Sequence, residues 1–325
     1  MTAATAPGPQ ARAAVVCGVG AALPSAVVSN ADLTARLDTT DEWIRSRTGI
    51  AQRHIAGVDL STEDLAVQAA TQALAGSTPV AVEALVVATT TPDRCCPATA
   101  PAVASRLGLT GIPAYDLAAG CTGFLYALAT ASGLITAGTA QAVLVIGADR
   151  LACLPDPEDR TTVPLFGDGA GAMVLRGGSV GEDGALGPVV LGSDGTLADL
   201  IRASHPGTLH MEGAEVFRNA VERMSAASLK AARAVGWDVE DLDRLVPHQA
   251  NARITGFVAR QLGVPYDRQL TNVEHVGNTG AASIPLLLAQ ATADGRLKAR
   301  HRVLLTAFGA GLTWGATTLT WPDLP

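Results

Sequence analysis

The stretch Ile112-Pro-Ala-Tyr-Asp-Leu-Ala-Ala-Gly-Cys121-Thr-Gly-Phe-Leu-Tyr-Ala-Leu128 decides both the fold and the chemistry of this chain. The apolar run Ile112–Leu117 predicts a buried strand, and the apolar residues after Gly123 recur with helical spacing. Cys121 therefore falls in the first turn of a buried helix. The N–H groups of a first turn have no partners within the helix and carry partial positive charge. We expect this setting to lower the pKa of the thiol and make it a nucleophile.

A structural role is the alternative for Cys121, because free cysteines are among the most buried residues. The other cysteines do not have the same setting. Cys17 lies in an apolar strand-like run, and Cys153 follows the end of a predicted strand. Cys95 and Cys96 are adjacent, which is not metal-ligand spacing, so we expect no metal site. The local sequence alone leaves the catalytic and structural interpretations of Cys121 open.

The composition sets limits on the class of protein. The chain has 325 residues, of which 48% are hydrophobic and 16% charged, enough for a large core. No apolar run approaches the roughly 20 residues that a membrane-spanning helix needs. A net charge of −7 argues against nucleic-acid binding. Residues 1–12 have neither a basic start nor an apolar core, which predicts a flexible tail. Five cysteines without scaffold spacing favour a reducing cytoplasm.

Strand-like and helix-like runs alternate along the chain, which indicates an α/β protein. The first half predicts strands at Val15–Gly20, Ala84–Thr89, Ile112–Leu117, Ala142–Gly147 and Ala170–Leu175, with helices at Leu60–Leu74, Pro101–Leu107 and Thr122–Ala137. The second half predicts strands at Arg244–Pro247, Val303–Ala307 and Gly315–Thr320, with helices at Ala214–Val235, Ala252–Leu262 and Ala281–Gln290.

Three landmarks recur in the second half at one constant separation. They are the pairs Leu85-Val86 and Leu245-Val246, Gly120 and Gly280, and Val143-Leu144 and Val303-Leu304. We therefore predict a duplication, with one half over residues 13–180 and the other over residues 181–325. Helices would pack between the sheets of a pseudo-twofold core. Cys121 corresponds to Ala281, so that only the first half keeps a nucleophile.

Two polar residues of the second half are candidate partners for the thiol. His248 follows a predicted buried strand, and the ends of such strands are where sites form. Asn278 lies in a polar loop before Gly280, which the repeat places at the same cleft as Gly120. A structural histidine and a helix-capping asparagine are the alternatives. Chemically, a cysteine thiolate accepts an acyl group from a thioester, and neutral His and Asn donate hydrogen bonds to an enolate oxygen.

Six motifs together resemble the β-ketoacyl-acyl-carrier-protein synthase III family, the initiating condensing enzymes of the thiolase superfamily. The resemblance covers about residues 13–320 and rests on Asp38-Thr-Thr-Asp-Glu-Trp43-Ile-Arg-Ser-Arg47-Thr-Gly-Ile50, Gly120-Cys-Thr-Gly-Phe124, Phe166-Gly-Asp-Gly-Ala-Gly-Ala172, Val246-Pro-His-Gln-Ala-Asn251, Gly277-Asn-Thr-Gly-Ala-Ala-Ser283 and Phe308-Gly-Ala-Gly-Leu-Thr-Trp-Gly315.

The resemblance implies a thiolase-like fold, in which two pseudo-symmetric βα halves form a five-layered αβαβα core, and a cytoplasmic homodimer. It implies that an acyl-CoA acylates Cys121. Decarboxylative Claisen condensation with malonyl-acyl-carrier protein then gives a 3-ketoacyl-carrier protein and CO2, which initiates fatty acid or polyketide chains. His248 and Asn278 would stabilise the enolate, and the backbone N–H groups of Cys121 and Ala310 would form the oxyanion hole. No cofactor is expected besides the two thioester substrates.

The resemblance also assigns residues to coenzyme A. Trp43 and Arg160 would sandwich the adenine, Arg47 would lie near the phosphates, and Asn251 would contact the pantetheine arm. Arginine–aromatic and arginine–phosphate contacts of this kind are physically sound.

Further residues are assigned to the acyl chain and to the carrier protein. Phe308 would line the mouth of the acyl pocket, and Cys96 falls where the family places a residue that crosses the dimer into the partner's pocket. The small Cys96 side chain predicts a roomier pocket for branched or longer primers. Arg218, Arg253 and Arg260 would form a basic patch for an acidic carrier protein.

Several other functions stay open on the sequence. The main one is a priming synthase or acyltransferase of secondary metabolism that transfers the acyl group without condensation. Asn278 favours condensation, because simple acyl transfer forms no enolate. A thiolase proper would need a second cysteine in the loop Phe308–Gly315, which has none. A cysteine hydrolase would not explain Trp43, Arg47 and Arg160, and a catalytically idle dimer partner would not need to retain Cys121, His248 and Asn278.

Overall fold

Two sheets form the framework of the computed structural model, which describes residues 12–203 and 208–324. The first sheet has the order β1 (Arg12–Ala22), β7 (Asp168–Ser179), β6 (Ala142–Arg150), β4 (Ala84–Ala88) and β5 (Ala114–Leu117). The second has the order β11 (Arg244–Pro247), β12 (Arg302–Gly309), β13 (Thr313–Thr320) and β8 (Val190–Ser193). In the first sheet β7 alone among the described strands runs opposite to its neighbours.

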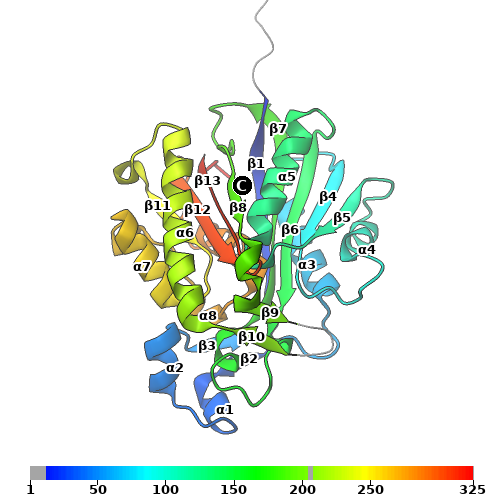
Figure 1. Ribbon diagram of the computed structural model, residues 1–325. Coiled ribbons are helices and arrows are strands. Elements are labelled where there is room, and N and C mark those ends of the chain that lie inside the picture. Colours follow the sequence, from blue (N-terminus) through cyan, green and yellow to red (C-terminus); the bar gives the residue numbers. More distant parts are fainter. Residues whose placement is uncertain (1–11, 204–207, 325) are drawn as a thin grey trace, which may run out of the picture.

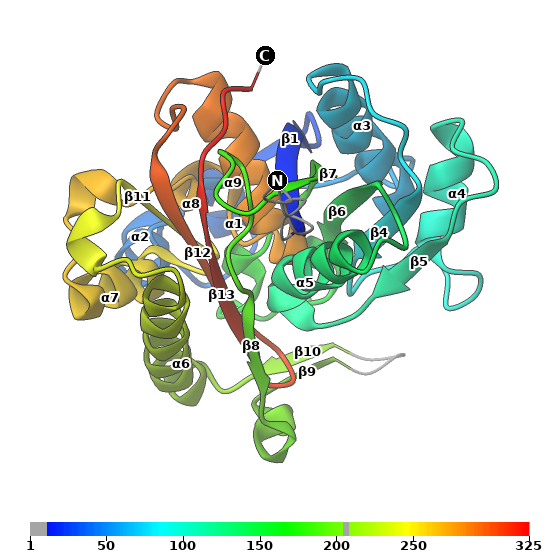
Figure 2. The same ribbon diagram turned by 90° about the horizontal axis from the view of Figure 1, so that it is seen from above.

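Helices lie between the sheets and on both outer faces, as Figure 2 shows from above. The middle layer contains α5 (Gly123–Thr136) and α9 (Ser283–Ala293), which contact strands of both sheets. One outer layer contains α3 (Thr62–Ala75) and α4 (Thr99–Arg106), and the other contains α6 (Gly213–Ala234) and α7 (Ala252–Leu262). This arrangement confirms the predicted αβαβα core.

The middle and outer helices differ in sequence because they are buried differently. Helix α5 has no charged residue, and its buried side chains include Phe124, Leu125 and Leu128. A helix apolar around its circumference has to be covered on more than one face. Helix α6 carries charges along its exposed side and buries Val216, Ala220 and Met224 on the other.

The two halves repeat the same backbone pattern. Strand β4 pairs in parallel with β6, with Leu85 opposite Leu144, and β11 pairs in parallel with β12, with Leu245 opposite Leu304. A 3-10 turn precedes each middle helix, Gly120–Thr122 before α5 and Gly280–Ala282 before α9. Both turns begin with a left-handed glycine, at φ 55° for Gly120 and 60° for Gly280. The pseudo-twofold repeat is therefore present in register and in turn geometry; its boundary between residues 180 and 181 stays a prediction.

Short elements gather at one end of the molecule (Figure 1). They are α1 (Asn30–Thr34), α2 (Asp41–Thr48), β2 (Val27–Ser29), β3 (Gln52–His54), α8 (Val273–Val276) and the hairpin β9 (Ile201–Ala203) and β10 (Leu209–Met211). The sequence did not predict these elements. The predicted tail is wrong by one residue, because Arg12 already belongs to β1; residues 1–11 lie outside the described residues. No described helix is both long and apolar enough to cross a membrane.

Candidate active site

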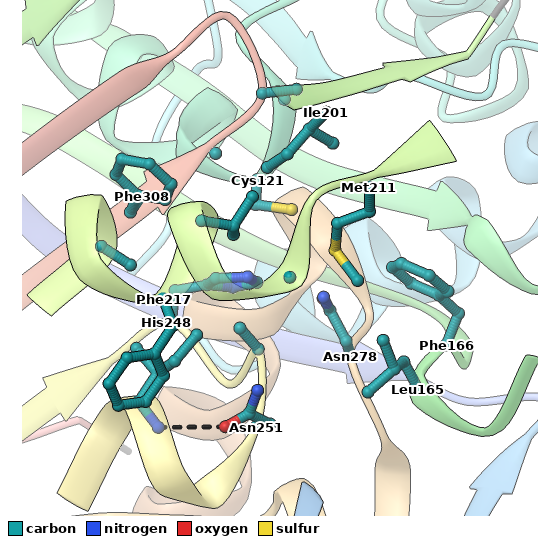
Figure 3. Close-up of a pocket in the computed structure, with 18 of the residues that line it drawn as sticks. Cys121, Leu165, Phe166, Ile201, Met211, Phe217, His248, Asn251, Asn278 and Phe308 are labelled. Atoms are coloured by element: carbon teal, nitrogen blue, oxygen red, sulfur yellow. Dashed lines mark hydrogen bonds between the residues drawn. The ribbon is translucent and has the colours of Figure 1, made fainter. Parts of the chain in front are cut away.

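A cavity of about 750 Å³ lies between the two halves, with residues of both in its wall. The side chains of Cys121, His248 and Asn278 converge on it (Figure 3). The structure thus brings the three predicted catalytic residues together from the 3-10 turn before α5, the end of β11 and the loop before α9. Other predicted residues in the wall are Arg47, Arg218, Asn251, Arg253, Phe308 and Ala310.

The backbone around Cys121 lies tightly against the loop that follows β12. A side chain on Gly309 would place its Cβ 2.6 Å from the Cys121 nitrogen, and one on Gly120 would place it 2.9 Å from the Ala310 nitrogen. Only glycine fits such contacts. Thr313 Oγ1 also donates a hydrogen bond to the Ala119 carbonyl oxygen (2.9 Å). Cys121 and Ala310 therefore lie on two closely packed backbone segments, and both residues line the cavity. That their N–H groups form an oxyanion hole stays a prediction.

The resting Cys121 thiol is neutral, which corrects our expectation of a lowered pKa. Burial and the charge of Asp149 raise the pKa of Cys121 to about 12. Hydrogen bonds from the Cys121 N–H and the Asn278 side chain oppose this shift without overcoming it. The predicted first-turn effect is therefore outweighed, first by burial of the thiol and then by Asp149, and the sequence did not show either.

His248 is neutral and buried. It follows β11, its backbone N–H donates to the Thr306 carbonyl oxygen (2.8 Å), and its side chain is only 2% exposed. Burial lowers the pKa of His248 to about 3. A neutral imidazole has one N–H donor, so this residue suits donation to a developing negative charge. It is a poor base in the resting site.

The carboxamide of Asn278 has a fixed orientation. The Gly280 N–H donates to its Oδ1 (3.0 Å), which identifies Nδ2 as the group facing the cavity. Its backbone forms a bridge to the segment between Leu165 and Gly167, because Asn278 N–H donates to the Leu165 oxygen (2.8 Å) and Gly167 N–H donates to the Asn278 oxygen (3.0 Å). The helix-capping alternative does not apply, since the side chain holds the turn rather than the helix.

Two buried polar side chains support this loop. Arg53 is fully buried and donates from Nη2 to the Pro164 oxygen (2.8 Å), next to the segment that bridges Asn278. Burial lowers the pKa of Arg53 to about 10. Gln249, next to His248, accepts at Oε1 from the N–H groups of Asn272 (3.2 Å) and Val273 (3.3 Å). His248 and the loop of Asn278 are therefore tied together by side chains that do not reach the cavity.

Of the four residues assigned to coenzyme A, Arg47 and Asn251 line the cavity. The guanidinium carbons of Arg47 and Arg160 lie 4.9 Å and 5.5 Å from the centre of the Trp43 ring. Arg47 lines the cavity, whereas Trp43 and Arg160 do not. Asn251 also lines it and accepts a hydrogen bond from the Ile254 N–H (3.0 Å), so it caps α7 while its amide nitrogen stays available for the cavity (Figure 3).

The remaining predicted residues are exposed. Arg218 and Arg253 lie at the cavity, and Arg253 lies 5.6 Å from the Phe217 ring. Arg260 lies outside the wall and covers Phe257 at 4.7 Å. Cys96 is exposed and does not line the cavity of its own chain.

The sequence analysis missed two groups of residues. One is the apolar wall formed by Leu151, Leu165, Leu209 and Met211, part of which lies on the short β10. The other is Asp149, whose fully buried carboxyl group acts on Cys121. An acidic residue in an otherwise apolar strand was the signal that could have revealed it. Within residues 12–203 and 208–324, no cluster of His, Cys, Asp and Glu is arranged to hold a metal ion.

Comparisons with known proteins agree with this geometry. Residues 115–195 match the model for 3-oxoacyl-[acyl-carrier-protein] synthase III, and residues 232–321 match the model for the C-terminal part of that family. Beta-ketoacyl-[acyl-carrier-protein] synthase III 3 of Streptomyces coelicolor is 54% identical, over 96% of this chain and 98% of its own length. The chain belongs to the 3-oxoacyl-[acyl-carrier-protein] synthase III family.

Solved structures place it within that family's fold. The 3-oxoacyl-(acyl carrier protein) synthase III of Pseudomonas aeruginosa superposes with a TM-score of 0.93 at 52% identity, covering 96% of this chain and 99% of that one. The priming β-ketosynthase of the R1128 polyketide pathway superposes with a TM-score of 0.92 at 36% identity, covering 99% and 100%. The chain is therefore a thiolase-fold acyltransferase of the synthase III type.

Proposed function

We propose that Cys121, His248 and Asn278 carry out the two half-reactions of a 3-oxoacyl-carrier-protein synthase III in this chain. The observation that supports this most directly is their convergence on one cavity, with a neutral histidine and an oriented carboxamide beside the thiol. A hydrolase needs a histidine that accepts a proton at neutral pH, and a buried imidazole with a pKa of about 3 does not.

In the first half-reaction, Cys121 Sγ attacks the carbonyl carbon of an acyl-CoA. The backbone N–H groups of Cys121 and Ala310 stabilise the resulting oxyanion. When the intermediate collapses, the bond to the CoA sulfur breaks, and CoA leaves with the proton that Cys121 has lost. Because the resting pKa of the thiol is about 12, proton loss accompanies the attack rather than preceding it.

In the second half-reaction, malonyl-carrier protein enters the emptied cavity. Its bond to the carboxylate breaks and releases CO2, and the electron pair moves into the thioester carbonyl to form an enolate. His248 and the Asn278 amide donate hydrogen bonds to the enolate oxygen. The nucleophilic carbon then attacks the acyl group on Cys121, and the Cys121 sulfur leaves as a thiolate. This thiolate takes up a proton from solvent, which restores the neutral thiol. The product is a 3-ketoacyl-carrier protein.

The lining of the cavity suits an acyl chain, and the basic residues in and near it suit CoA. Apolar side chains of Leu151, Leu165, Leu209 and Met211 form much of the wall, which suits an acyl group. Arg47 and the Trp43–Arg160 pair suit the phosphates and the adenine. The exposed Arg218, Arg253 and Arg260 suit an acidic carrier protein, although the chain itself is acidic.

We also propose a homodimer that works in the cytoplasm. Strand β5 is at the edge of the first sheet, and all four of its residues are only partly buried. An exposed edge strand is a template for pairing with another chain. All five cysteines are free, which is consistent with a reducing compartment. The likeness to the R1128 priming synthase supports polyketide initiation as the second candidate pathway beside fatty acid initiation.

Intact-protein mass spectrometry tests this function. We would incubate the protein with a panel of acyl-CoAs, add malonyl-carrier protein and measure acyl-enzyme, CO2 and product. We expect the acyl group to load on Cys121 and then appear in a 3-ketoacyl-carrier protein two carbons longer. Asn278→Ala should still load but release CO2 at least about a hundredfold more slowly. Loading followed by acyl transfer without CO2 would instead establish the acyltransferase alternative.

A further inference from the structure

The side chain of Gln249 is fully buried next to the candidate catalytic histidine, and both of its polar atoms have partners. Its Oε1 accepts hydrogen bonds from the Thr271 hydroxyl (2.8 Å) and from the N–H groups of Asn272 (3.2 Å) and Val273 (3.3 Å). Its Nε2 donates to the Pro247 carbonyl oxygen (2.8 Å). Exchanging the two atoms would turn the NH2 group toward two N–H donors, so these partners fix the orientation of the amide.

The partners of Gln249 lie on both sides of Asn278 in the sequence. Residues 271–273 precede Asn278, and the Gln249 backbone N–H donates to Ser283 Oγ (2.7 Å), which follows it. Gln249 therefore holds both ends of the segment 271–283, which contains α8, Asn278 and the turn before α9. Ser283 is buried as well, so water has little access to this contact.

Gln249 also fixes the end of β11. It follows His248 in the chain, and its Nε2 bonds to Pro247, which precedes His248. The His248 N–H in turn donates to the Thr306 oxygen on β12 (2.8 Å). His248 and Asn278 both line the cavity (Figure 3), whereas Gln249 is absent from its wall. Any effect of Gln249 on the reaction therefore passes through the residues that it holds.

We propose that Gln249 is a positioning residue that sets the distance between His248 and Asn278, the two donors to the enolate oxygen. Such donors stabilise a developing charge best when they are held in place beforehand. A misplacement of about 1 Å can cost about a hundredfold in rate. This role rests on the proposed condensation, because acyl transfer to Cys121 forms no enolate and does not need this distance.

Gln249→Met tests this role, because Met has a similar length and makes none of the hydrogen bonds of the amide. We would load the variant with an acyl-CoA, add malonyl-carrier protein and measure acyl-enzyme and CO2 separately. CO2 release should fall about tenfold to a hundredfold, while loading stays within about threefold of the wild-type rate. A defect of folding alone would lower the amount of active enzyme and therefore both rates equally.

Gln249→Glu is the conservative variant. Burial raises the pKa of a carboxyl group, and a protonated Glu has one oxygen that accepts and one O–H that donates, as the amide does. Gln249→Glu should therefore retain more CO2 release than Gln249→Met. Ser283→Ala removes only the acceptor of the Gln249 backbone N–H, and it should also lower CO2 release more than loading.

Thr317→Val is the matched control, because it removes a buried hydrogen bond away from the cavity. Thr317 lies on β13 and donates from Oγ1 to the Gly187 oxygen (3.1 Å). Both half-reactions should proceed as in the wild type. A wild-type rate of CO2 release in Gln249→Met, or an equal loss of loading and CO2 release, would overturn the proposal. If Gln249→Met does not fold, the same two rates in Gln249→Glu and Ser283→Ala decide it.

Hydrogen exchange distinguishes failure of this inference from failure of the proposed function. A wild type that loads acyl groups and releases no CO2 would contradict the proposed function. The N–H groups of Asn272 and Val273 should still exchange faster in Gln249→Met than in the wild type or Thr317→Val, because they lose their acceptor. Unchanged exchange in Gln249→Met would show that Gln249 does not hold this segment, and would overturn the proposal.

Discussion

At the scale of single residues, the site contains a nucleophile and a hydrogen-bond donor that are both neutral at rest. Cys121 is protonated because of burial and Asp149, and His248 is unprotonated because of burial. Neither state could be inferred from the sequence, which shows the residue types but not how much water surrounds them. The identity of the three catalytic candidates, by contrast, followed from their motifs and from the repeat.

The neutral His248 predicts a pH dependence of stability. Its pKa is about 3 in the folded protein and 6.5 as the ordinary value. The unfolded chain therefore binds a proton that the folded one does not, and stability is lost as pH falls below about 6.5. We expect the loss from this residue to be about 2 kcal/mol between about pH 7 and pH 5. Urea unfolding at both pH values measures it.

His248→Asn is the control for that measurement. It removes the titrating group, so the free energy of unfolding should change less with pH than in the wild type over the same interval. Equal slopes in the wild type and His248→Asn would contradict a buried neutral imidazole.

At the scale of elements, close backbone contacts join the layers. A Cβ on Gly171 of β7 would lie 2.4 Å from the Leu286 nitrogen of α9, and one on Gly147 of β6 would lie 2.2 Å from the Ala281 oxygen. Glycines in these strands therefore let the middle layer approach the first sheet. The packing of these strands against the middle layer therefore depends on their glycines as well as on their apolar side chains.

Gly171→Ala should destabilise the protein. The added methyl group meets backbone atoms of α9 that cannot move aside, and overpacking of this kind costs about 1–3 kcal/mol or more. Gly133→Ala is the matched change, because Gly133 lies in α5 with open space around it. It should stabilise by about 0.5–1 kcal/mol, through helix propensity. In urea denaturation, the free energy of unfolding should fall below the wild-type value for Gly171→Ala and rise above it for Gly133→Ala.

The elements predicted from the sequence are those with enough residues to show a period. Helices α3 and α6 and strands β6 and β12 were found close to their observed bounds. The strands β2, β3, β9 and β10 have three residues each, too few for any periodicity. Their places depend on tertiary contacts, such as the pairing of Leu209 with Ala203. That is why the apolar wall from β10 was missed while Cys121 was not.

At the scale of the whole molecule, the chain presents a basic cavity mouth on an acidic protein. Arg218 and Arg253 flank the cavity, whereas the net charge is −7. Local charge of this kind would steer an acidic partner, as proposed for the carrier protein, without making the protein a general anion binder. The patch belongs to α6 and α7, and both helices also carry arginines away from the cavity.

Arg253→Glu should weaken the use of carrier protein and spare acyl loading. We expect KM for malonyl-carrier protein to rise about tenfold or more, because a like charge then faces an acidic partner. Arg233→Glu makes the same charge change in the last turn of α6, outside the cavity wall, and should leave KM near the wild-type value. A similar rise of KM in both variants would indicate that the net charge of the protein, and not a local docking surface, affects the binding of the carrier protein.

The proposed dimer makes a prediction about primer choice. Cys96 is exposed on its own chain, so it can affect an acyl pocket only across a dimer. Cys96→Phe should therefore narrow the accepted primers toward acetyl-CoA, as measured by loading across a panel of acyl-CoAs. Cys95→Phe alters the neighbouring exposed position and serves as the control. If the accepted primers are the same in Cys96→Phe as in the wild type, Cys96 does not line an acyl pocket of either protomer.

The neutral state of the unloaded Cys121 bears on how the enzyme survives peroxide. Hydrogen peroxide attacks the thiolate and converts it to sulfenic acid, and further oxidation is irreversible. A buried thiol with a pKa of about 12 offers little thiolate to a small oxidant. We therefore expect the burial that raises this pKa to slow oxidation of Cys121 between turnovers as well.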